Sequence, residues 1–232
     1  YAVGTLVVCS LLFRFWPWGA LLLWPAISLG VVAWGYLGQG PMIFCKNKGQ
    51  LHWSARLVLA PCLLGQTLSL WYYRGQCRPY DEVTPKIWMG RLLSNNEAAT
   101  LTRLGVRAVL DLTAEFSEAR PFRALNYRNI PILDLTAPST SQLQEMAAFL
   151  ESESQKGIVY CHCKIGYSRT VAAVAAYLLQ TGKVKSVSDA IASLRQVRPT
   201  IVVRPEITSA LSTFMRSLPP LAEEVSPPFF SS

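Results

Sequence analysis

Hydrophobic residues are distributed unevenly along this chain, and its first third is the most apolar part. The segment 18–38 has 21 residues without a charge, the length that a helix needs to cross the hydrocarbon core of a bilayer. The segments 1–13 and 57–73 are apolar but shorter, and the latter contains Pro61 and several polar residues. We therefore predict a membrane region over 1–77 with two or three apolar segments, the third of which either spans the bilayer or lies at its interface.

The pattern changes from about Arg78 to Ser217. Four short runs rich in branched and aromatic residues predict strands, at 86–90, 107–112, 127–133 and 157–161. Helical spacing lies between and after them, at 96–104, 141–154, 171–179, 186–197 and from Pro205 onward. Alternating strands and helices predict an α/β domain, a sheet flanked by helices, over 78–217. The Pro/Ser-rich segment 218–232 is expected to be a disordered tail.

Charge separates the same two regions. The formal net charge is +8, yet residues 1–78 contain no acidic residue and carry six basic ones. Positive charge placed among Trp and Tyr favours an anionic membrane surface as the partner. No nucleic-acid-binding motif accompanies it, so we expect no nucleic acid partner.

The segment 158–170 holds the strongest candidate chemistry. An apolar strand ends at Cys163, a loop containing Gly166 follows, and Arg169 and Thr170 precede a strongly helical run. Backbone N–H groups of such a loop, together with the helix dipole, form a site for phosphate. The same N–H groups and dipole lower the pKa of a thiol at the start of the loop, which predicts that Cys163 is a thiolate near neutral pH.

This arrangement predicts attack by the Cys163 thiolate on the phosphorus of a phosphate monoester, which leaves a phosphocysteine. Arg169 is expected to bind two phosphoryl oxygens as a fork, which a lysine does less well. Thr170 is expected to donate a hydrogen bond to the sulfur when it departs. The residues expected to bind the phosphate are Lys164, Ile165, Gly166, Tyr167, Ser168 and Arg169.

The run from His162-Cys163 through five residues to Arg169-Thr170 resembles the signature of the cysteine-dependent protein tyrosine phosphatases. The resemblance covers the whole predicted domain, because Trp88–Arg91 and Val109–Thr113 look like the first βαβ unit of dual-specificity members. It implies their fold and the hydrolysis of phosphotyrosine, phosphoserine and phosphothreonine. No segment corresponds to the one that deepens the pocket of tyrosine-specific members.

A general acid is also required, to protonate the leaving oxygen. Asp134 is the preferred candidate, because it ends a strand-like run 29 residues before Cys163 and begins a Pro/Ser/Thr loop. The resemblance implies the same separation for the acid of dual-specificity members. Asp111 is the alternative, although the end of a strand also suits an aspartate that holds a turn.

The remaining histidine and cysteine residues predict structural tasks. His162 is expected to fix the backbone of the loop and to favour the thiolate rather than to act as acid or base. Cys161 is expected to be a small apolar strand residue, because a disulfide to Cys163 is geometrically strained. With only one further histidine, His52, the sequence predicts neither a metal site nor a cofactor.

Three hypotheses for function follow. The first is a membrane-attached phosphatase of phosphoproteins. The second is a phospholipid phosphatase, because Val159–Lys164 and Val197–Pro205 resemble the mitochondrial-type phosphatidylglycerophosphate phosphatases, from which Tyr167 departs where a basic residue is expected. The third is an inactive phosphate-binding adaptor at the membrane.

The expected location is a membrane, with the catalytic domain on the cytoplasmic side. The arrangement resembles bacterial inner-membrane phosphatases in which a dual-specificity domain follows membrane helices. The basic loop from Lys46 to Arg56 is predicted to be cytoplasmic. The number of basic residues on each side of segment 57–73 does not determine on which side of the membrane the following domain lies. A cysteine thiolate requires a reducing compartment, so we expect the domain in the cytoplasm.

Overall fold

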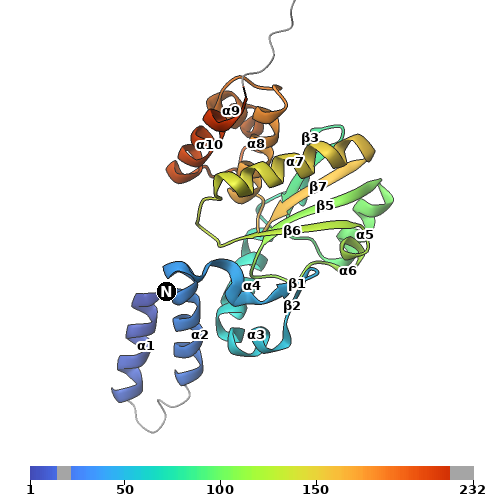
Figure 1. The fold of residues 1–232 in the computed structure, drawn as a ribbon. Coiled ribbons are helices and arrows are strands. Elements are labelled where there is room, and N and C mark those ends of the chain that lie inside the picture. The colour runs from blue at the N-terminus through green and yellow to red at the C-terminus, as the bar shows by residue number, and fades with distance from the viewer. Residues whose placement is uncertain (15–21, 220–232) are drawn as a thin grey trace, which may run out of the picture.

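The computed structural model describes residues 1–14 and 22–219, and its centre is a five-stranded mixed sheet (Figure 1). The strand order is β3-β4-β7-β5-β6, in which β3 pairs antiparallel with β4 and the other neighbours are parallel. The strands are β3 (Tyr80–Thr84), β4 (Ile87–Arg91), β5 (Val106–Thr113), β6 (Asn126–Ile132) and β7 (Ile158–Cys163). The predicted α/β fold with a sheet flanked by helices is confirmed.

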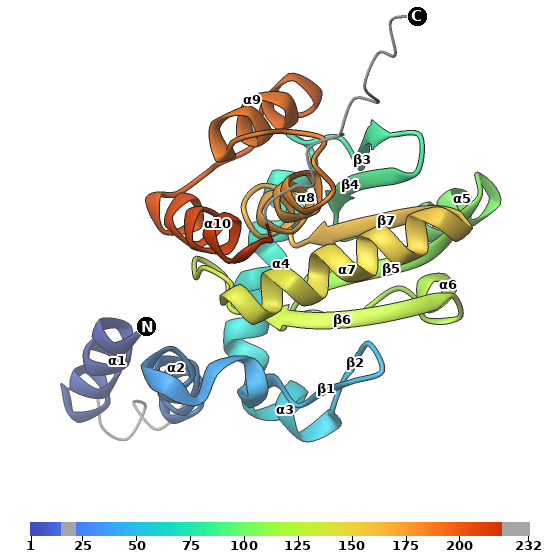
Figure 2. The ribbon, with the colours of Figure 1, turned by 45° about the horizontal axis from the view of Figure 1, so that its top comes forward.

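Helices cover both faces of this sheet. Figure 2 shows α7 (Thr140–Lys156) in front of the strands. The helix α8 (Arg169–Gln180) packs against α7 and β7, and α9 (Val187–Val197) and α10 (Pro205–Ser217) pack on α8. The helices α5 (Asn95–Arg103) and α6 (Arg120–Arg123) contact the opposite face. The parallel strands thus direct their carboxyl ends to one edge of the sheet, where α/β proteins bind ligands.

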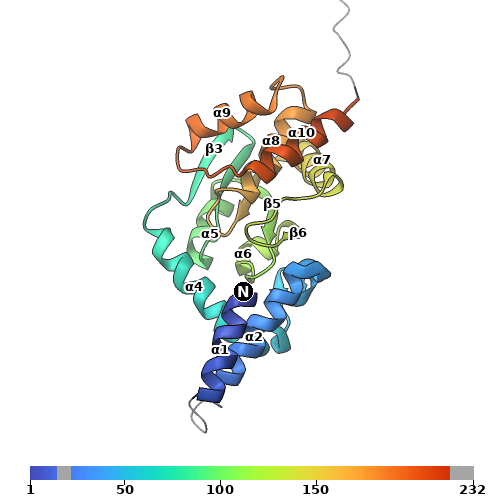
Figure 3. The same ribbon diagram turned by 90° about the vertical axis from the view of Figure 1, so that its left-hand side faces the viewer.

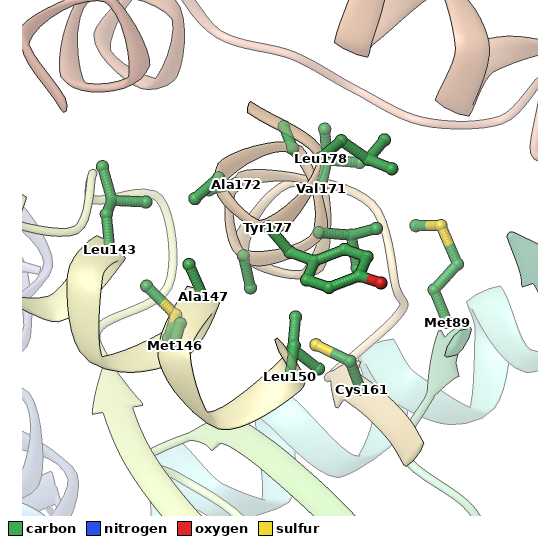
Figure 4. Close-up of a cluster of buried hydrophobic side chains, with 14 of the residues drawn as sticks. Met89, Leu143, Met146, Ala147, Leu150, Cys161, Val171, Ala172, Tyr177 and Leu178 are labelled. Carbon is green, nitrogen blue, oxygen red and sulfur yellow. The ribbon is translucent and has the colours of Figure 1, made fainter. Parts of the chain in front are cut away.

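Alternation along the strands divides the core. In β7, Val159, Cys161 and Cys163 point to the large cluster under α7 and α8, whereas Ile158 and Tyr160 contact the smaller cluster under α5 and α6. Figure 4 shows Cys161 between Leu150 and Met89 in the large cluster. Cys161 is fully buried, as expected of a small apolar strand residue.

The predicted strands and helices of the domain are present, and the strand β3 is an addition to them. Its sequence, Tyr-Asp-Glu-Val-Thr, is mostly polar, and Asp81 is the only one of its residues that is buried. An edge strand with polar residues gives little periodic signal, so the pattern alone predicts β4 and misses β3.

The N-terminal part forms a group of elements below the sheet (Figures 1 and 3). The helices α1 (Ala2–Arg14) and α2 (Leu23–Trp34) pack together, and a hairpin of β1 (Lys46–Asn47) and β2 (Gln50–Leu51) leads to α3 (Trp53–Val58) and α4 (Ala60–Arg74). Among the described residues, only the helical run Leu23–Phe44 is long and apolar enough to cross a membrane by length and composition.

The predicted membrane segments meet the structure only in part. Residues 18–21 at the start of the 18–38 segment, and most of the 218–232 tail, lie outside the described residues. The 57–73 segment is not one continuous helix, because α3 ends at Val58 and α4 begins at Ala60. Pro61 at the start of α4 explains the break, since proline lacks the N–H that would continue α3.

Side chains from both sides of residue 77, the predicted domain boundary, pack together. Side chains from Phe44, Leu51 and Leu59 share one apolar cluster with Ala114 and Leu133 of the sheet domain. The hairpin adds a backbone hydrogen bond of 2.7 Å from Glu118 N–H to the carbonyl of Gly49. The segment around the hairpin therefore packs against the sheet domain.

Candidate active site

The loop between β7 and α8 brings the predicted site residues together. Cys163 is the last residue of β7, and Arg169 is the first residue of α8. Gly166 has a φ of +75°, and a Cβ there would lie 2.4 Å from the carbonyl oxygen of Gly90. Only glycine fits this conformation and this close approach to β4, so the loop is held tightly against the sheet.

The Cys163 sulfur is surrounded by hydrogen-bond donors. Burial by itself would raise the pKa of this thiol, but Arg169, Thr170 and the Gly166 backbone N–H outweigh burial and lower it. The Gly166 nitrogen lies 3.3 Å from Sγ. Among the described residues the buried Thr170 hydroxyl has no other hydrogen-bond partner, so it is available to donate a hydrogen bond to the Cys163 sulfur. Cys163 is thus favoured as a thiolate.

Arg169 is fixed in position by a glutamate that the sequence patterns did not predict. The two guanidinium nitrogens donate to the two carboxylate oxygens of Glu115, at 3.1 and 2.8 Å. Arg169 also donates to the carbonyl of Ile132 at 2.9 Å and to Asp134 at 3.2 Å. Because Arg169 and Glu115 are both almost fully buried, this paired fork keeps one orientation.

A cavity of about 310 Å³ opens over the sulfur, a volume within the usual range for small-molecule sites. The loop residues from Cys163 to Arg169, apart from Gly166, line one side of it. The other lining residues are Ser69, Tyr73, Asp134, Leu135, Val202 and Arg204. Lys164, Ile165, Tyr167 and Ser168 therefore all face the space that the phosphate is predicted to occupy.

The two candidate acids have different surroundings. Asp134 lines the cavity, and its side chain is about one-third exposed. Asp111 is fully buried away from the cavity and accepts hydrogen bonds from Lys46 at 2.5 Å, from Tyr127 at 2.6 Å and from the Thr113 N–H at 2.8 Å. The structure thus gives Asp134 the access that a general acid needs, and gives Asp111 a structural environment.

His162 lies beneath the loop in a buried network of charges. Its Nε2 contacts Glu118 at 2.6 Å, and its Nδ1 lies 3.3 Å from the carbonyl oxygen of Cys163. Burial would lower the pKa of His162, but Glu118 and Asp111 raise it to about 9. The imidazolium therefore donates at both nitrogens at neutral pH and ties the backbone of Cys163 to Glu118.

The same network holds the only group of candidate metal ligands found among the described residues. Atoms of Asp111, Glu118 and His162 lie within 4.8 Å of one another. Two cations, the Lys46 ammonium and the His162 imidazolium, already balance the two carboxylates. These residues therefore fit a closed ionic network better than a metal site.

We expect Lys46→Met to lower the free energy of unfolding by about 3 kcal/mol. The Lys46 side chain is 3% exposed and donates to Asp111 and to the Thr113 carbonyl, so its removal leaves a buried carboxylate short of a cation. Urea denaturation of the full chain measures the change. Lys86→Met, at an exposed position in the β3–β4 turn, is the matched control, and equal losses in the two variants would contradict this assignment.

Helix α4 contributes directly to the loop. The Lys164 ammonium donates to Gln66 at 2.6 Å and to Ser69 at 3.0 Å, and Ser69 and Tyr73 line the cavity. The segment that the hydrophobic pattern predicted as a membrane segment is therefore a wall of the site. Gln66 and Ser69 are polar residues within an apolar run, and they were the sequence feature that indicated a polar contact on this helix.

Arg198 supports the loop from the other side. Its guanidinium donates to Asp81 at 2.6 Å and to the carbonyl of Ile165 at 3.0 Å, and it lies over the ring of Tyr167. The side chain of Arg198 is almost fully buried. Arg198 thus holds two of the predicted phosphate-binding residues in place.

A buried thiolate at the carboxyl end of a strand, facing a paired arginine at the start of the next helix, defines the site of a cysteine-dependent phosphatase. The family model described as the dual specificity phosphatase catalytic domain matches residues 87–217, more than half of the chain. The chain therefore belongs to the dual-specificity phosphatase family, which confirms the resemblance found in the sequence.

Two of the curated proteins that are similar to this chain are named as phosphatases of the phospholipid phosphatidylglycerophosphate. Phosphatidylglycerophosphate phosphatase PTPMT2 of Arabidopsis thaliana is 27% identical over 175 residues, covering 72% of this chain and 76% of the relative. The human phosphatidylglycerophosphatase and protein-tyrosine phosphatase 1 is 27% identical over 184 residues, covering 71% and 87%. Mouse dual specificity protein phosphatase 12 is 32% identical over 124 residues, covering 51% and 36%.

Solved structures show the same fold. The crystal structure of PTPMT1 in complex with PI(5)P has a TM-score of 0.54 and 23% sequence identity, and the match covers 60% of this chain and 96% of that chain. The active form of Tk-PTP has a TM-score of 0.56 and 23% identity, with 60% and 98% covered.

Proposed function

We propose that this protein hydrolyses the phosphate monoester of a phospholipid head group at a membrane surface. The observation that carries the proposal is the wall formed by α4, which lines the catalytic cavity with Ser69 and Tyr73. The outward side chains of the same helix are apolar and exposed, Leu64 at 61%, Leu68 at 59% and Trp71 at 76%. An apolar surface beside the cavity suits a substrate whose head group leaves the bilayer while its acyl chains stay in it.

The mechanism begins with the Cys163 thiolate, which attacks phosphorus while the bond to the leaving oxygen breaks. Arg169, oriented by Glu115, binds two phosphoryl oxygens together with the N–H groups of the loop, and so stabilises the charge that develops on them. The carboxylic acid of Asp134 gives its proton to the leaving alkoxide. The products of this step are the dephosphorylated alcohol and a phosphocysteine.

The second step returns the enzyme to its starting state. The Asp134 carboxylate takes a proton from a water molecule, whose oxygen attacks the phosphocysteine. The bond between sulfur and phosphorus breaks, and the Thr170 hydroxyl stabilises the departing Cys163 thiolate. Inorganic phosphate leaves, so one water is consumed for each ester hydrolysed.

A phosphoprotein is the second candidate substrate, and the hydrogen bonds of Lys164 favour it. This ammonium is the one cation among loop residues 164–168, and Gln66 and Ser69 already bind it. Tyr167 occupies a place where a further basic residue would suit a highly charged head group. These contacts favour a substrate with a single phosphate and little additional negative charge, as in a phosphotyrosine side chain.

The two candidates are separated by their specificity constants. We expect kcat/KM for phosphatidylglycerophosphate in mixed micelles to exceed that for phosphotyrosine peptides by about tenfold or more, because only the lipid contacts the apolar surface of α4. Soluble glycerol phosphates serve as the control for the head group alone. A peptide preferred over the lipid, or a soluble head group as good as the lipid, would reject the lipid proposal.

A further inference from the structure

Two cavities away from the catalytic one adjoin each other below the sheet. The first has a volume of about 570 Å³ and lies between the β1–β2 hairpin, α3 and α6. Three cationic side chains line it, Lys48, Arg56 and Arg123, and no acidic residue belongs to its lining. Such a cavity attracts an anion.

The second cavity is apolar and has a volume of about 700 Å³. Trp24 of α2, Leu63 and Leu64 of α4, and Phe116 contribute to its lining. Leu51 and Arg56 line both cavities, so the basic space continues into the apolar one. The only carboxylate of this second lining is Glu115, which Arg169 already pairs.

We propose that the two cavities together bind one anionic phospholipid, as a site separate from the catalytic one. The phosphate of the head group binds to Lys48, Arg56 and Arg123, and an acyl chain enters the apolar cavity between α2 and α4. The volumes lie within the usual range for ligand sites. This inference does not depend on the substrate, because neither cavity contains Cys163.

The surface around the cavities favours a lipid over a soluble anion. Trp53 and Leu57 of α3 and Trp24 of α2 are exposed there, at 70%, 59% and 49%. Tryptophan beside arginine and lysine is the combination that proteins place at a membrane interface. Figure 1 shows α3 and the hairpin on the same lower side of the molecule as the α1–α2 pair. The helical run long enough to cross a bilayer, Leu23–Phe44, begins with α2.

The positions of the basic residues also fit a lipid head group. Arg56 reaches Ser117 at 3.0 Å, which places its guanidinium at the junction of the two cavities. A phosphate bound at Arg56 therefore lies where a chain attached to it continues directly into the apolar cavity. Residues 1–78 contain no carboxylate that would compete for these cations within the same segment.

The test measures binding of phosphatidylserine, which carries a phosphodiester and is therefore not hydrolysed as a monoester. The full chain is held in uncharged detergent micelles, and orthovanadate occupies the catalytic loop. A phosphatidylserine with a fluorescent acyl chain is titrated by anisotropy, and a phosphatidylcholine with the same chain serves as the uncharged probe. We expect wild-type protein to bind phosphatidylserine at least about tenfold more tightly than phosphatidylcholine.

Two variants test the two halves of the site. Lys48→Gln/Arg56→Gln is expected to weaken phosphatidylserine binding about tenfold, and Trp24→Asp to weaken binding of both lipids. The matched control is Lys183→Gln/Lys185→Gln, which removes the same charge from exposed positions beside α8 and α9. Equal weakening of phosphatidylserine binding by this control and by Lys48→Gln/Arg56→Gln would overturn the proposal. Equal affinity of the wild-type protein for the two lipids would also overturn it, and so would full displacement of phosphatidylserine by millimolar inorganic phosphate. Turnover of para-nitrophenyl phosphate, measured in parallel, reports on the catalytic site alone.

Discussion

The variant Cys163→Ser is expected to lose turnover of para-nitrophenyl phosphate by about four to six orders of magnitude, the size of effect seen when a covalent nucleophile is removed. The donors around Sγ, namely Arg169, Thr170 and the Gly166 N–H, stabilise a thiolate. The same donors do not ionise a serine hydroxyl near neutral pH, so no adequate nucleophile is left. Release of para-nitrophenolate by purified full chain measures the loss, and retained turnover would refute the mechanism.

The pH dependence of the wild-type enzyme gives an independent check. Because the pKa of Cys163 is lowered, kcat/KM rises with pH as the thiol ionises, and this limb lies below the ordinary thiol pKa of about 8.5. Asp134→Ala supplies the companion variant. It keeps the nucleophile but removes the acid, and mass spectrometry of the quenched reaction should detect a phosphocysteine.

The catalytic loop could be predicted because its determinants are contiguous in the sequence. Cys163, Gly166 and Arg169 lie within a few residues, and the strand before them and the helix after them fix how they are placed. The phosphate site is thus encoded locally by a strand, a loop and a helix start. The position of Asp134 at the cavity was predictable for a related reason, since this residue follows a strand that ends at the same edge of the sheet.

The partners of that loop could not be predicted, because they are distant in sequence. Glu115 pairs with Arg169 across 54 residues, Glu118 with His162 across 44, and Lys46 with Asp111 across 65. No periodic pattern marks such pairs, since each is created by the packing of separate elements. The position of Glu115 and Glu118 just after β5 was the only available signal, because that strand ends beside β7.

Helix α4 shows a different limit of the hydrophobic pattern. Its segment reads as apolar because one side packs on the sheet domain through Leu70 while the other side exposes Leu64, Leu68 and Trp71. A helix that is apolar on both sides resembles a membrane segment in composition. The positions of Gln66 and Ser69 against Lys164 become visible only when the catalytic loop is placed beside the helix.

The second large effect is expected from Arg169→Lys, which should lower kcat/KM by about 10³-fold to 10⁴-fold. Lysine keeps the charge, but its ammonium cannot bind two phosphoryl oxygens and the two oxygens of Glu115 at once. The loss of kcat/KM therefore reports the contribution of the planar guanidinium geometry rather than that of the positive charge. Rates with a soluble aryl phosphate are suitable, because they do not depend on how a lipid is presented.

Folding and catalysis must be separated in this variant, because Arg169 and Glu115 are both almost fully buried. A single lysine leaves the Glu115 carboxylate poorly paired, and breaking a buried pair costs about 3–5 kcal/mol. The double variant Arg169→Lys/Glu115→Gln replaces the poorly paired Glu115 carboxylate by a neutral amide of the same shape and leaves Asp134 to pair with the lysine, so it should recover part of the free energy of unfolding. Its kcat/KM should nevertheless stay low, since neither change restores the fork. Recovery of activity together with stability would show instead that Arg169 acts only by holding the fold.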